Sequence, residues 1–486
     1  MNKLTFIIPF LVLLIVSGCF ATNNDDTQTL PLSACSIPGG IEAMCGTISV
    51  LENRSLADSR QLELNIAVIP AKSSFPEPDP LIMLAGGPGQ AATAVFAPYV
   101  NLLEDLNEER DIVLVDQRGT GDSSPLTCEE LSSEDEDPNL TDEQIIARIQ
   151  ECAREIAQTA DLTQYTTAQA VADFDAAREA LGYEQINLYG VSYGTRAAQA
   201  YARQFPQRVR TMTLDAVTSP ELILFLQMPR DGQRALEMLF ERCAADAVCN
   251  EAYPDFAAEY EILLERLAED PQEISLIHPQ SGKEIQYTLT GDRLANMVYA
   301  LLYSTDLVSL LPLGIHEAYE NENYAPLVTQ GILVGEGAGM NLGLLYAVTC
   351  AEDAPLIDLA EAEEIRREAL FPLRAEFFLD VCQAYPHVTS AGNIRQPLRT
   401  DIPVLLLSGD ADPVTPPYYA DQVAENLANS EHIVVPGFGH GLLGVGCMSK
   451  IFSQFVSTGV TSELDTACLE KLEPPPFFVD LSGPEA

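Results

Sequence analysis

The sequence is poor in positive charge. Its 486 residues include 26 lysines and arginines against 72 aspartates and glutamates, which gives a formal net charge of −46. A surface this acidic repels the phosphates of nucleic acids, so the composition excludes nucleic acid as a partner. The charge indicates a strongly solvated surface, and it leaves open a substrate that carries a cationic group.

The sequence also lacks an apolar run long enough to span a membrane. One long apolar run, at residues 4–16, follows Lys3 and is too short to span a bilayer. It ends in Val16-Ser17-Gly18-Cys19, which resembles a bacterial lipobox. We therefore predict a lipoprotein signal peptide at 1–18, lipidation of Cys19, and a tether at 19–32. The protein would be exported and held on a bacterial cell membrane, at its periplasmic or extracellular face, by the lipid alone. An ordinary signal peptide with an incidental cysteine is the alternative.

No two cysteines have the C-x-x-C spacing of zinc or redox sites, so we expect no metal. There are eleven cysteines, and setting Cys19 aside leaves ten, an even number that suits disulfides in an oxidising compartment. Short loops cost the least entropy to close, so each cysteine is expected to pair with its neighbour along the chain. The predicted bridges are Cys35–Cys45, Cys128–Cys152, Cys243–Cys249, Cys350–Cys382 and Cys447–Cys468.

Strand-like and helix-like segments alternate at both ends of the chain. Two hairpin-like strands after Cys45 are followed by buried strand patterns near 81–84, 111–115, 186–190 and 209–217, with a helical pattern at 166–183. This alternation predicts an α/β fold, a mostly parallel sheet with helices on both faces. The pattern breaks at 219 and resumes near 396, so we predict a first core segment at 33–218, a helical cap at 219–395 and a second core segment at 396–486.

The segment "NLYGVSYGTRAAQAYARQFP", residues 187–206, carries the first chemical signal. A strand pattern runs into Gly-Val-Ser-Tyr-Gly and then directly into a helical pattern. Glycines two residues before and after Ser192 allow the tight, strained turn of a nucleophile elbow. Chance matches to Gly-x-Ser-x-Gly are common, but this strand–turn–helix context favours a catalytic serine.

A serine nucleophile needs a base, and the chain has five histidines. His440 lies in a glycine-rich loop just past a strand pattern, where nothing crowds the ring, and it is the best candidate. The acid that orients the histidine could be Asp410 or Asp412, which share one turn after the strand near 404–407. The order Ser, Asp, His is the one that α/β-hydrolases use.

The oxyanion of an acyl-transfer intermediate needs backbone N–H donors. One is expected from Tyr193, directly after the nucleophile. A second is expected from the Gly-Gly-Pro-Gly turn at 86–89, which follows the first buried strand. Such a turn could also bind phosphate, but no Gly-Lys-Ser/Thr follows it.

Together these motifs resemble the α/β-hydrolase branch that contains the prolyl iminopeptidases and tripeptidyl aminopeptidases. The matching pieces, in the family's order, are "GGPG", "DQRGTGDSS", "GVSYG", "GDADPVTP" and "GFGHG". The resemblance implies that Asp412 is the acid, that Gly87 and Tyr193 supply the oxyanion donors, and that no cofactor is needed. It also places Arg118 and Asp122 in a turn that supports the site.

Two positions depart from the prolyl iminopeptidases, which usually have histidine before the glycine turn and tryptophan after the nucleophile. Here these positions are Ala85 and Tyr193. The departure leaves backbone donors intact but puts proline specificity in doubt. The cysteine-rich cap and export signal look more like the tripeptidyl aminopeptidases.

The expected function is therefore an exported serine exopeptidase, an aminopeptidase that releases N-terminal residues or short peptides from peptides. The resembling enzymes bind the substrate amine with cap carboxylates, and Glu352 and Asp353, beside Cys350, are the predicted pair. The alternatives are an esterase or other small-molecule hydrolase with the same triad, and a binding lipoprotein without activity.

Overall fold

The computed structural model describes residues 30–128, 140–337, 339–386, 394–480 and 482–484. The predicted signal peptide, Cys19 and tether residues 19–29 lie outside these ranges, so these three assignments stay predictions.

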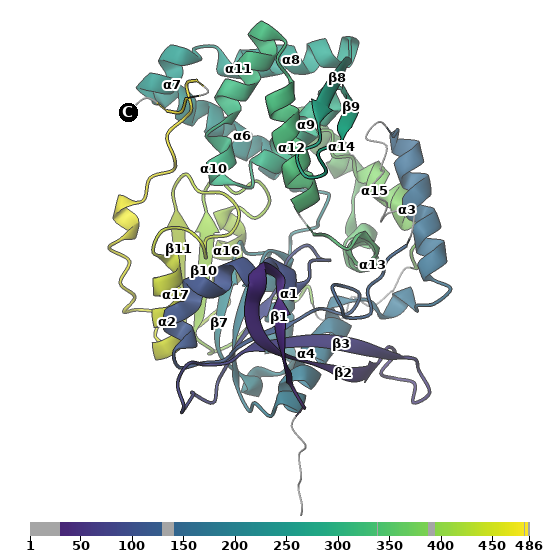
Figure 1. The fold of residues 1–486 in the computed structure, drawn as a ribbon, viewed down its shortest axis with the longest axis vertical. Helices are drawn as coiled ribbons and strands as arrows, with labels where there is room; N and C mark the ends of the chain where they lie inside the picture. Colours follow the sequence, from purple (N-terminus) through teal and green to yellow (C-terminus); the bar gives the residue numbers. More distant parts are fainter. Residues whose placement is uncertain (1–29, 129–139, 338, 387–393, 481, 485–486) are drawn as a thin grey trace, which may run out of the picture.

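A nine-stranded sheet lies at the centre of the described chain, with the strand order β1-β2-β3-β5-β4-β6-β7-β10-β11 (Figure 1). The strands β5, β4, β6, β7, β10 and β11 run parallel, and β1, β2 and β3 continue the sheet antiparallel. Their bounds are β1 (Ser33–Ile37), β2 (Ile41–Leu51), β3 (Gln61–Ile69), β4 (Leu81–Leu84), β5 (Ile112–Val115), β6 (Ile186–Val191), β7 (Val209–Asp215), β10 (Val404–Gly409) and β11 (Ser430–Val435). Every residue of β4, β5 and β10 is buried, as expected for parallel strands covered on both faces.

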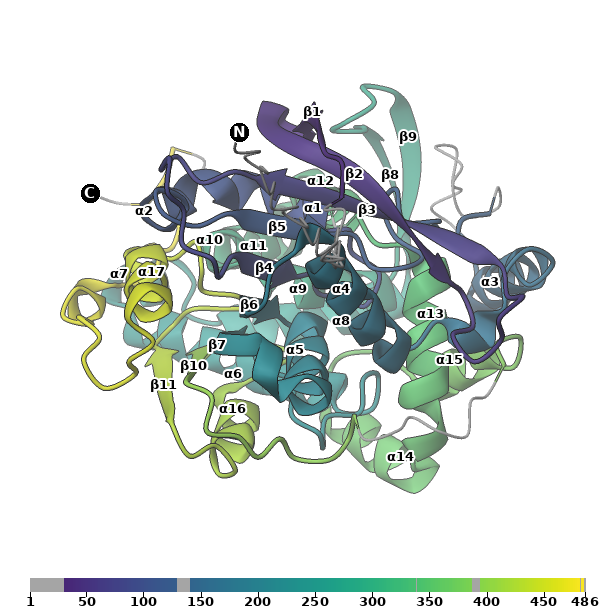
Figure 2. The same ribbon diagram turned by 90° about the horizontal axis from the view of Figure 1, so that it is seen from below.

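Helices cover both faces of this sheet (Figure 2). One face packs against α4 (Thr167–Leu181), α5 (Tyr193–Gln204) and α16 (Pro417–Ala424). The other face packs against α1 (Ala92–Val95), α2 (Glu104–Asn107) and α17 (Met448–Thr458). The structure thus confirms the predicted fold class, a mostly parallel sheet between two helical layers.

The carboxyl ends of the central parallel strands lie at one edge of the sheet. In the strand register Asp215, the last residue of β7, is paired with Val191 of β6 on one side and with Leu407 of β10 on the other. The loops that follow β6, β10 and β11 therefore leave the sheet together. These loops carry Ser192, Asp412 and His440.

A cap lies over this edge (Figure 1). Its elements are α6 (Met228–Ala245), α7 (Ala247–Ala252), α8 (Phe256–Glu269), β8 (Gln272–Ile277), β9 (Glu284–Leu289), α9 (Gly291–Leu301), α10 (Thr305–Val308), α11 (Leu311–Asn321), α12 (Ala325–Gly337), α13 (Leu342–Glu352), α14 (Leu359–Glu368) and α15 (Ala375–Cys382). The cap was predicted to be helical, and it is, apart from the antiparallel hairpin formed by β8 and β9.

Two segments assigned to the core by sequence lie against the cap. The helix α3 (Asp142–Ile156) packs on α13 and α15 in one hydrophobic cluster. The C-terminal segment also returns to the cap, where Phe477 joins the main cap cluster and Tyr253 of the cap donates to the carbonyl of Val479 at 2.8 Å. Hydrophobic contacts decide both placements, and they are invisible to the strand–helix alternation that predicted the boundaries.

Five disulfides join neighbouring cysteines, as the sequence predicted. The bridges are Cys35–Cys45, Cys128–Cys152, Cys243–Cys249, Cys350–Cys382 and Cys447–Cys468. Cys350 and Cys382 link α13 to α15 inside the cap, and Cys447–Cys468 closes the segment that follows His440.

Candidate active site

Ser192 lies at the bend between β6 and α5. Its backbone dihedrals are φ 55° and ψ −127°, a strained conformation of the kind that clusters at functional sites. Close backbone contacts explain both motif glycines. A Cβ on Gly190 would lie 2.4 Å from the carbonyl oxygen of Gly194, and one on Gly194 would lie 2.1 Å from that of Leu84. The local structure is therefore the nucleophile elbow that the sequence predicted.

Asp412 follows β10 and is fully buried. Its carboxylate accepts hydrogen bonds from the amides of Val414 and Thr415, at 2.8 and 2.9 Å, and from the Thr415 hydroxyl at 2.6 Å. Burial alone would raise the pKa of Asp412, but the charge and hydrogen bond of His440, with the bonds from Thr415, hold the pKa below its ordinary value. Asp412 therefore stays ionised.

His440 follows β11 and meets Asp412. Its Nδ1 lies 2.8 Å from Asp412 Oδ2. Burial alone would lower the pKa of His440, but the charge of Asp412, its hydrogen bond and the charge of Asp215 raise the pKa above the ordinary value. The other candidate acid, Asp410, accepts from the amide of Gly437 and holds the turn instead. Of the two aspartates, the structure brings Asp412 to the histidine.

The cap contributes to the positions of both loops. Arg234 of α6 donates to the backbone carbonyl of Asp412 at 3.0 Å. The amide of His440 donates to the carbonyl of Tyr303, just after α9, at 3.0 Å. The ring of Tyr303 also lies edge-on to the imidazole, with 5.0 Å between centroids. The loops of the candidate acid and base are thus held by the cap as well as by the sheet.

A pocket of about 650 Å³ lies between core and cap, and both Ser192 and His440 line it. The remaining wall is mostly aromatic and aliphatic, from both parts of the molecule, which is typical of a site for a small organic ligand. The main contributors are Val95, Phe96, Tyr99, Tyr189, Val191, Tyr299, Tyr303, Val334, Met340 and Leu443.

The two predicted oxyanion donors lie beside the nucleophile. Gly87 lines the pocket, and its φ of 106° suits glycine, because a Cβ there would lie 2.8 Å from the sulfur of Met340. Tyr193 is the first residue of α5, where backbone N–H groups have no partner within the helix. The Tyr193 hydroxyl lies 2.7 Å from the Thr167 hydroxyl, and this contact fixes the position of the Tyr193 ring.

Glu352 and Asp353 do not line this pocket. They are 2% and 0% exposed. Asp353 accepts from both terminal nitrogens of Arg196, at 2.9 and 3.1 Å, and from Arg395. Glu352 accepts from the amide and the hydroxyl of Thr167, at 2.7 and 2.8 Å. The prediction that this pair binds the substrate amine is therefore wrong: both carboxylates are buried and engaged by the protein itself.

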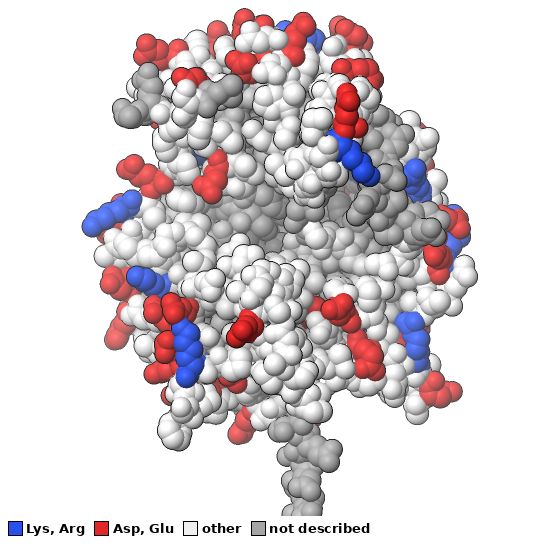
Figure 3. Space-filling model, viewed as in Figure 1, with Lys and Arg blue, Asp and Glu red and all other residues white. Residues whose placement is uncertain are grey.

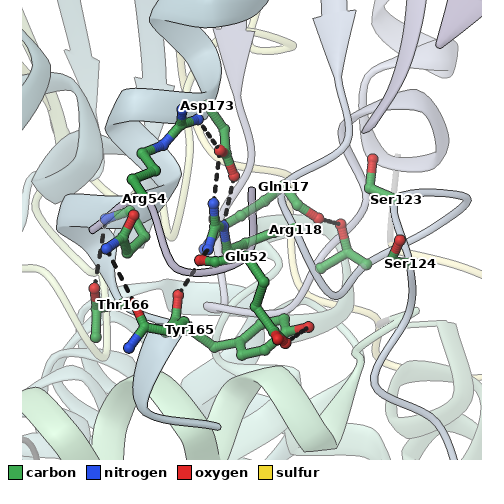
Figure 4. Close-up of polar contacts among 12 residues, drawn as sticks. Glu52, Arg54, Gln117, Arg118, Ser123, Ser124, Tyr165, Thr166 and Asp173 are labelled. Carbon is green, nitrogen blue, oxygen red and sulfur yellow. Dashed lines mark hydrogen bonds and ion pairs between the residues drawn. The ribbon is translucent and has the colours of Figure 1, made fainter. Parts of the chain in front are cut away.

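Arg118, predicted to support the site, is fully buried and points toward Asp173 (Figure 4). Its guanidinium donates to both oxygens of Asp173 in α4, at 2.6 and 2.7 Å, and to two backbone carbonyls at 2.9 Å. Arg54 contacts the same carboxylate from a second loop. Arg118 thus ties three segments together. Asp122, in the same turn, is exposed.

Three residues near the site escaped the sequence analysis. Thr415 contacts both Asp412 and His440, Tyr303 packs on the imidazole, and Asp215 lies beside the nucleophile. Thr415 was inside the quoted "GDADPVTP" motif, and Asp215 was a single acidic residue at the end of the strand pattern at 209–217. Tyr303 gave no signal, because its contact depends on how the cap docks.

Among the described residues, no helix is both long and apolar enough to cross a membrane. Within the same ranges, no group of three or more histidine, cysteine, aspartate or glutamate side chains is arranged to hold a metal ion.

Two families of known proteins match the chain. The profile described as the alpha/beta hydrolase fold matches residues 79–268, and that described as TAP-like protein matches residues 373–468. The first match spans the nucleophile elbow, and the second spans Asp412 and His440. Fold and site together define a serine hydrolase.

Relatives of known name narrow this class. The chain is 27% identical over 473 residues to the serine protease Hip1 of Mycobacterium tuberculosis, covering 89% of this chain and 88% of that protein. It is 30% identical over 190 residues to a tripeptidyl aminopeptidase of Streptomyces lividans (36% and 35% covered). It is 28% identical over 146 residues to a proline iminopeptidase of Neisseria gonorrhoeae (30% and 35% covered). The chain has the α/β-hydrolase fold and is similar to serine peptidases of the prolyl iminopeptidase and tripeptidyl aminopeptidase type.

Proposed function

We propose that this protein is an exported serine aminopeptidase that releases N-terminal residues or short peptides from peptide substrates. One observation carries the proposal: Ser192 and His440, which is paired with Asp412, line one pocket that the cap covers. A covered pocket suits the end of a chain better than its middle. Similarity to a tripeptidyl aminopeptidase and a proline iminopeptidase supports the same conclusion.

In the first half of the reaction, the Ser192 hydroxyl oxygen attacks the carbonyl carbon of the scissile amide. His440 takes the hydroxyl proton, and Asp412 stabilises the imidazolium that forms. The amides of Gly87 and Tyr193 donate to the oxyanion of the tetrahedral intermediate. The C–N bond then breaks, the leaving amine takes the proton from His440, and an acyl ester remains on Ser192.

In the second half, water replaces the amine. His440 takes a proton from the water molecule as the water oxygen attacks the ester carbonyl. When this intermediate collapses, the proton returns to the Ser192 oxygen and the acyl product leaves as a carboxylic acid. Apart from the substrate and this water molecule, both halves use only groups of the chain.

The lining of the pocket favours one second candidate, an esterase or other acyl hydrolase. An aminopeptidase needs a carboxylate that can reach a cationic substrate amine. Asp215 is the carboxylate among the described lining residues, and it is fully buried and hydrogen-bonded. An uncharged acyl group fits this aromatic pocket without such a partner.

A hydrolysis panel separates the two candidates. Aminoacyl, dipeptidyl and tripeptidyl amides would be compared free and N-acetylated, beside acyl esters of similar size, with Ser192→Ala as the background control. An aminopeptidase cleaves free amides of one preferred length and loses most of its kcat/KM on acetylation. Equal rates for free and acetylated amides, or cleavage of esters alone, would contradict the aminopeptidase assignment.

Export and lipidation form a separate part of the proposal. Support comes from the lipobox-like sequence at Cys19 and from the five disulfides, which form in oxidising compartments. Cells fed a labelled fatty acid should incorporate it into the full chain and not into Cys19→Ala. Label retained by the variant would contradict lipidation at this cysteine.

A further inference from the structure

Asp215 contacts both chain segments that carry the proposed nucleophile and base. Its backbone carbonyl accepts the amide of Ser192 at 3.0 Å. Its carboxylate accepts the amide of Leu442 at 2.9 Å and that of Leu443 at 3.0 Å. These amides lie two and three residues beyond His440. One residue at the end of β7 therefore joins the nucleophile elbow to the loop of the base.

If Asp215 served packing alone, burying its carboxylate would cost desolvation free energy that an apolar residue would avoid. Asp215 is 0% exposed and ends β7, between the buried residues Leu214 and Ala216. Its hydrogen bonds come from the two amides and from the hydroxyl of Tyr189, at 2.7 Å. A buried carboxylate is tolerated only when it is well hydrogen-bonded, and a neutral side chain would avoid the desolvation cost. Burial raises the pKa of Asp215, against the effect of its hydrogen bonds and of the charge of His440. A carboxyl group at this position therefore needs an explanation.

We propose that Asp215 is a positioning residue of the active site: it sets the distance between Ser192 and His440, and its charge favours the imidazolium formed during acyl transfer. This inference rests on the proposed roles of Ser192 and His440. Asp215 does not replace Asp412, which makes the direct 2.8 Å contact with Nδ1. Asp412 acts on the imidazole ring directly. Asp215 holds the loop that follows His440 and adds a negative charge near the ring.

Besides its contacts with the loop, Asp215 affects His440 through its charge, as the groups around the imidazole show. On the ring nitrogen Nδ1 lie Asp412 and, at 3.3 Å, the hydroxyl of Thr415. From the cap, the neutral ring of Tyr303 packs edge-on. From β7, the charge of Asp215 adds to that of Asp412 in raising the pKa of His440, against the opposing effect of burial. Removing the Asp215 charge should therefore lower the pKa of the base.

The test is Asp215→Asn, compared with the wild type over a full pH range. Asparagine keeps the side-chain volume but removes the charge and replaces one of the two oxygens that accept the amide of Leu442 with an NH2 group. We expect kcat to fall by about a hundredfold, the effect of a small misplacement of reacting groups, with KM changed less than about twofold. The acidic limb of kcat/KM should also move to lower pH.

Asp79→Asn is the matched control. Asp79 is also buried and hydrogen-bonded, by Asn187 at 2.8 Å and Arg110 at 3.1 Å, but it precedes β4 at the opposite edge of the sheet. We expect this variant to lose stability in thermal melts while keeping the wild-type pH limb. Asp215→Ser, which also lacks the charge, is measured in the same way if the asparagine variant does not fold.

The outcomes separate this inference from the proposed function. A lower kcat with a shifted limb in the Asp215 variants, and an unshifted limb in Asp79→Asn, supports it. An unchanged pH limb in folded Asp215 variants, or a loss of stability alone, overturns it while leaving the triad intact. Turnover that persists in Ser192→Ala would instead overturn the proposed function.

Discussion

The hydroxyl of Thr415 lies between the proposed acid and base. It is 2.6 Å from Asp412 Oδ2 and 3.3 Å from His440 Nδ1. The shorter contact is a hydrogen bond to a charged group, and it helps to hold the pKa of Asp412 below its ordinary value. Because the same oxygen faces the imidazole, Thr415 orients the carboxylate toward the ring.

Replacing Thr415 by valine should therefore slow the chemical step. Hydrogen bonds to charged groups contribute about 1.5–3 kcal/mol, so kcat should fall roughly 10- to 100-fold while KM stays near the wild-type value. Thr415→Ser keeps the hydroxyl and should retain most of the activity. Steady-state kinetics with thermal melts would check this, and equal activity of the two variants would show that the hydroxyl has no role.

The activity should depend on pH through His440. The base must be neutral to accept the Ser192 proton, and its pKa is raised by Asp412 and Asp215 against the effect of burial. As a result, kcat/KM should rise with pH along a limb whose midpoint lies above about 6.5, the ordinary pKa of histidine. The residual activity of Asp412→Asn should show a midpoint at lower pH. A midpoint below that of free histidine in the wild type would contradict this electrostatic description.

At the scale of elements, buried charges join the cap to the helix of the nucleophile. α5 begins directly after Ser192 and carries Arg196, whose guanidinium pairs with Asp353 at the end of cap helix α13. Burial alone would raise the pKa of Asp353, but the charges of Arg196 and Arg395 hold it below its ordinary value. The carboxylate predicted to bind substrate therefore fastens α13 to α5.

Asp353→Asn should strongly destabilise the fold. Removing one member of a buried ion pair costs about 3–5 kcal/mol. Without the Asp353 carboxylate, Arg196 would be left with the longer contact to Glu352, at 3.7 Å, and Arg395 would lose its ion pair with Asp353. Urea unfolding would measure this loss, with the exposed Asp380→Asn of α15 as a control expected to change stability by less than about 0.5 kcal/mol. Similar stabilities of the two variants would contradict a fastening role. The ratio of rates on free and acetylated substrates should stay the same in Asp353→Asn.

At the scale of the whole molecule, strand topology explains why the site was visible in the sequence. Parallel strands share one carboxyl edge, so residues that follow β6, β10 and β11 meet although Ser192 and His440 lie far apart in the chain. Local signals at each strand end were therefore sufficient for the sheet and the elbow, and they reduced the candidate acids to Asp410 and Asp412. The choice of Asp412 came from the family resemblance.

Contacts between distant segments were not visible. The sequence showed the acidity of Glu352 and Asp353 but not the position of Arg196, which is 157 residues away from Asp353. The packing of α3 on the cap and the return of the C-terminal segment depend in the same way on tertiary contacts without a local pattern. The sequence therefore predicted helices and strands, but not which side chains contact one another between distant segments.

The acidic surface is likewise a property of the whole molecule. Aspartates and glutamates are spread over cap and core in Figure 3 instead of forming one patch, and the face drawn is hollowed between the two parts. A net charge of −46 spread in this way indicates solvation of the surface rather than one binding site for a cationic partner.

Covalent labelling of the intact protein tests most directly whether Ser192 is the nucleophile of this site. The wild type would be treated with a fluorophosphonate and mapped by peptide mass spectrometry, beside Ser192→Ala, His440→Ala and Asp412→Asn. We expect a single phosphonyl group on Ser192, no label in Ser192→Ala, and labelling slowed by orders of magnitude in the other two variants. Stoichiometric label on a different serine, or undiminished labelling of Ser192→Ala, would contradict the assignment of the active site.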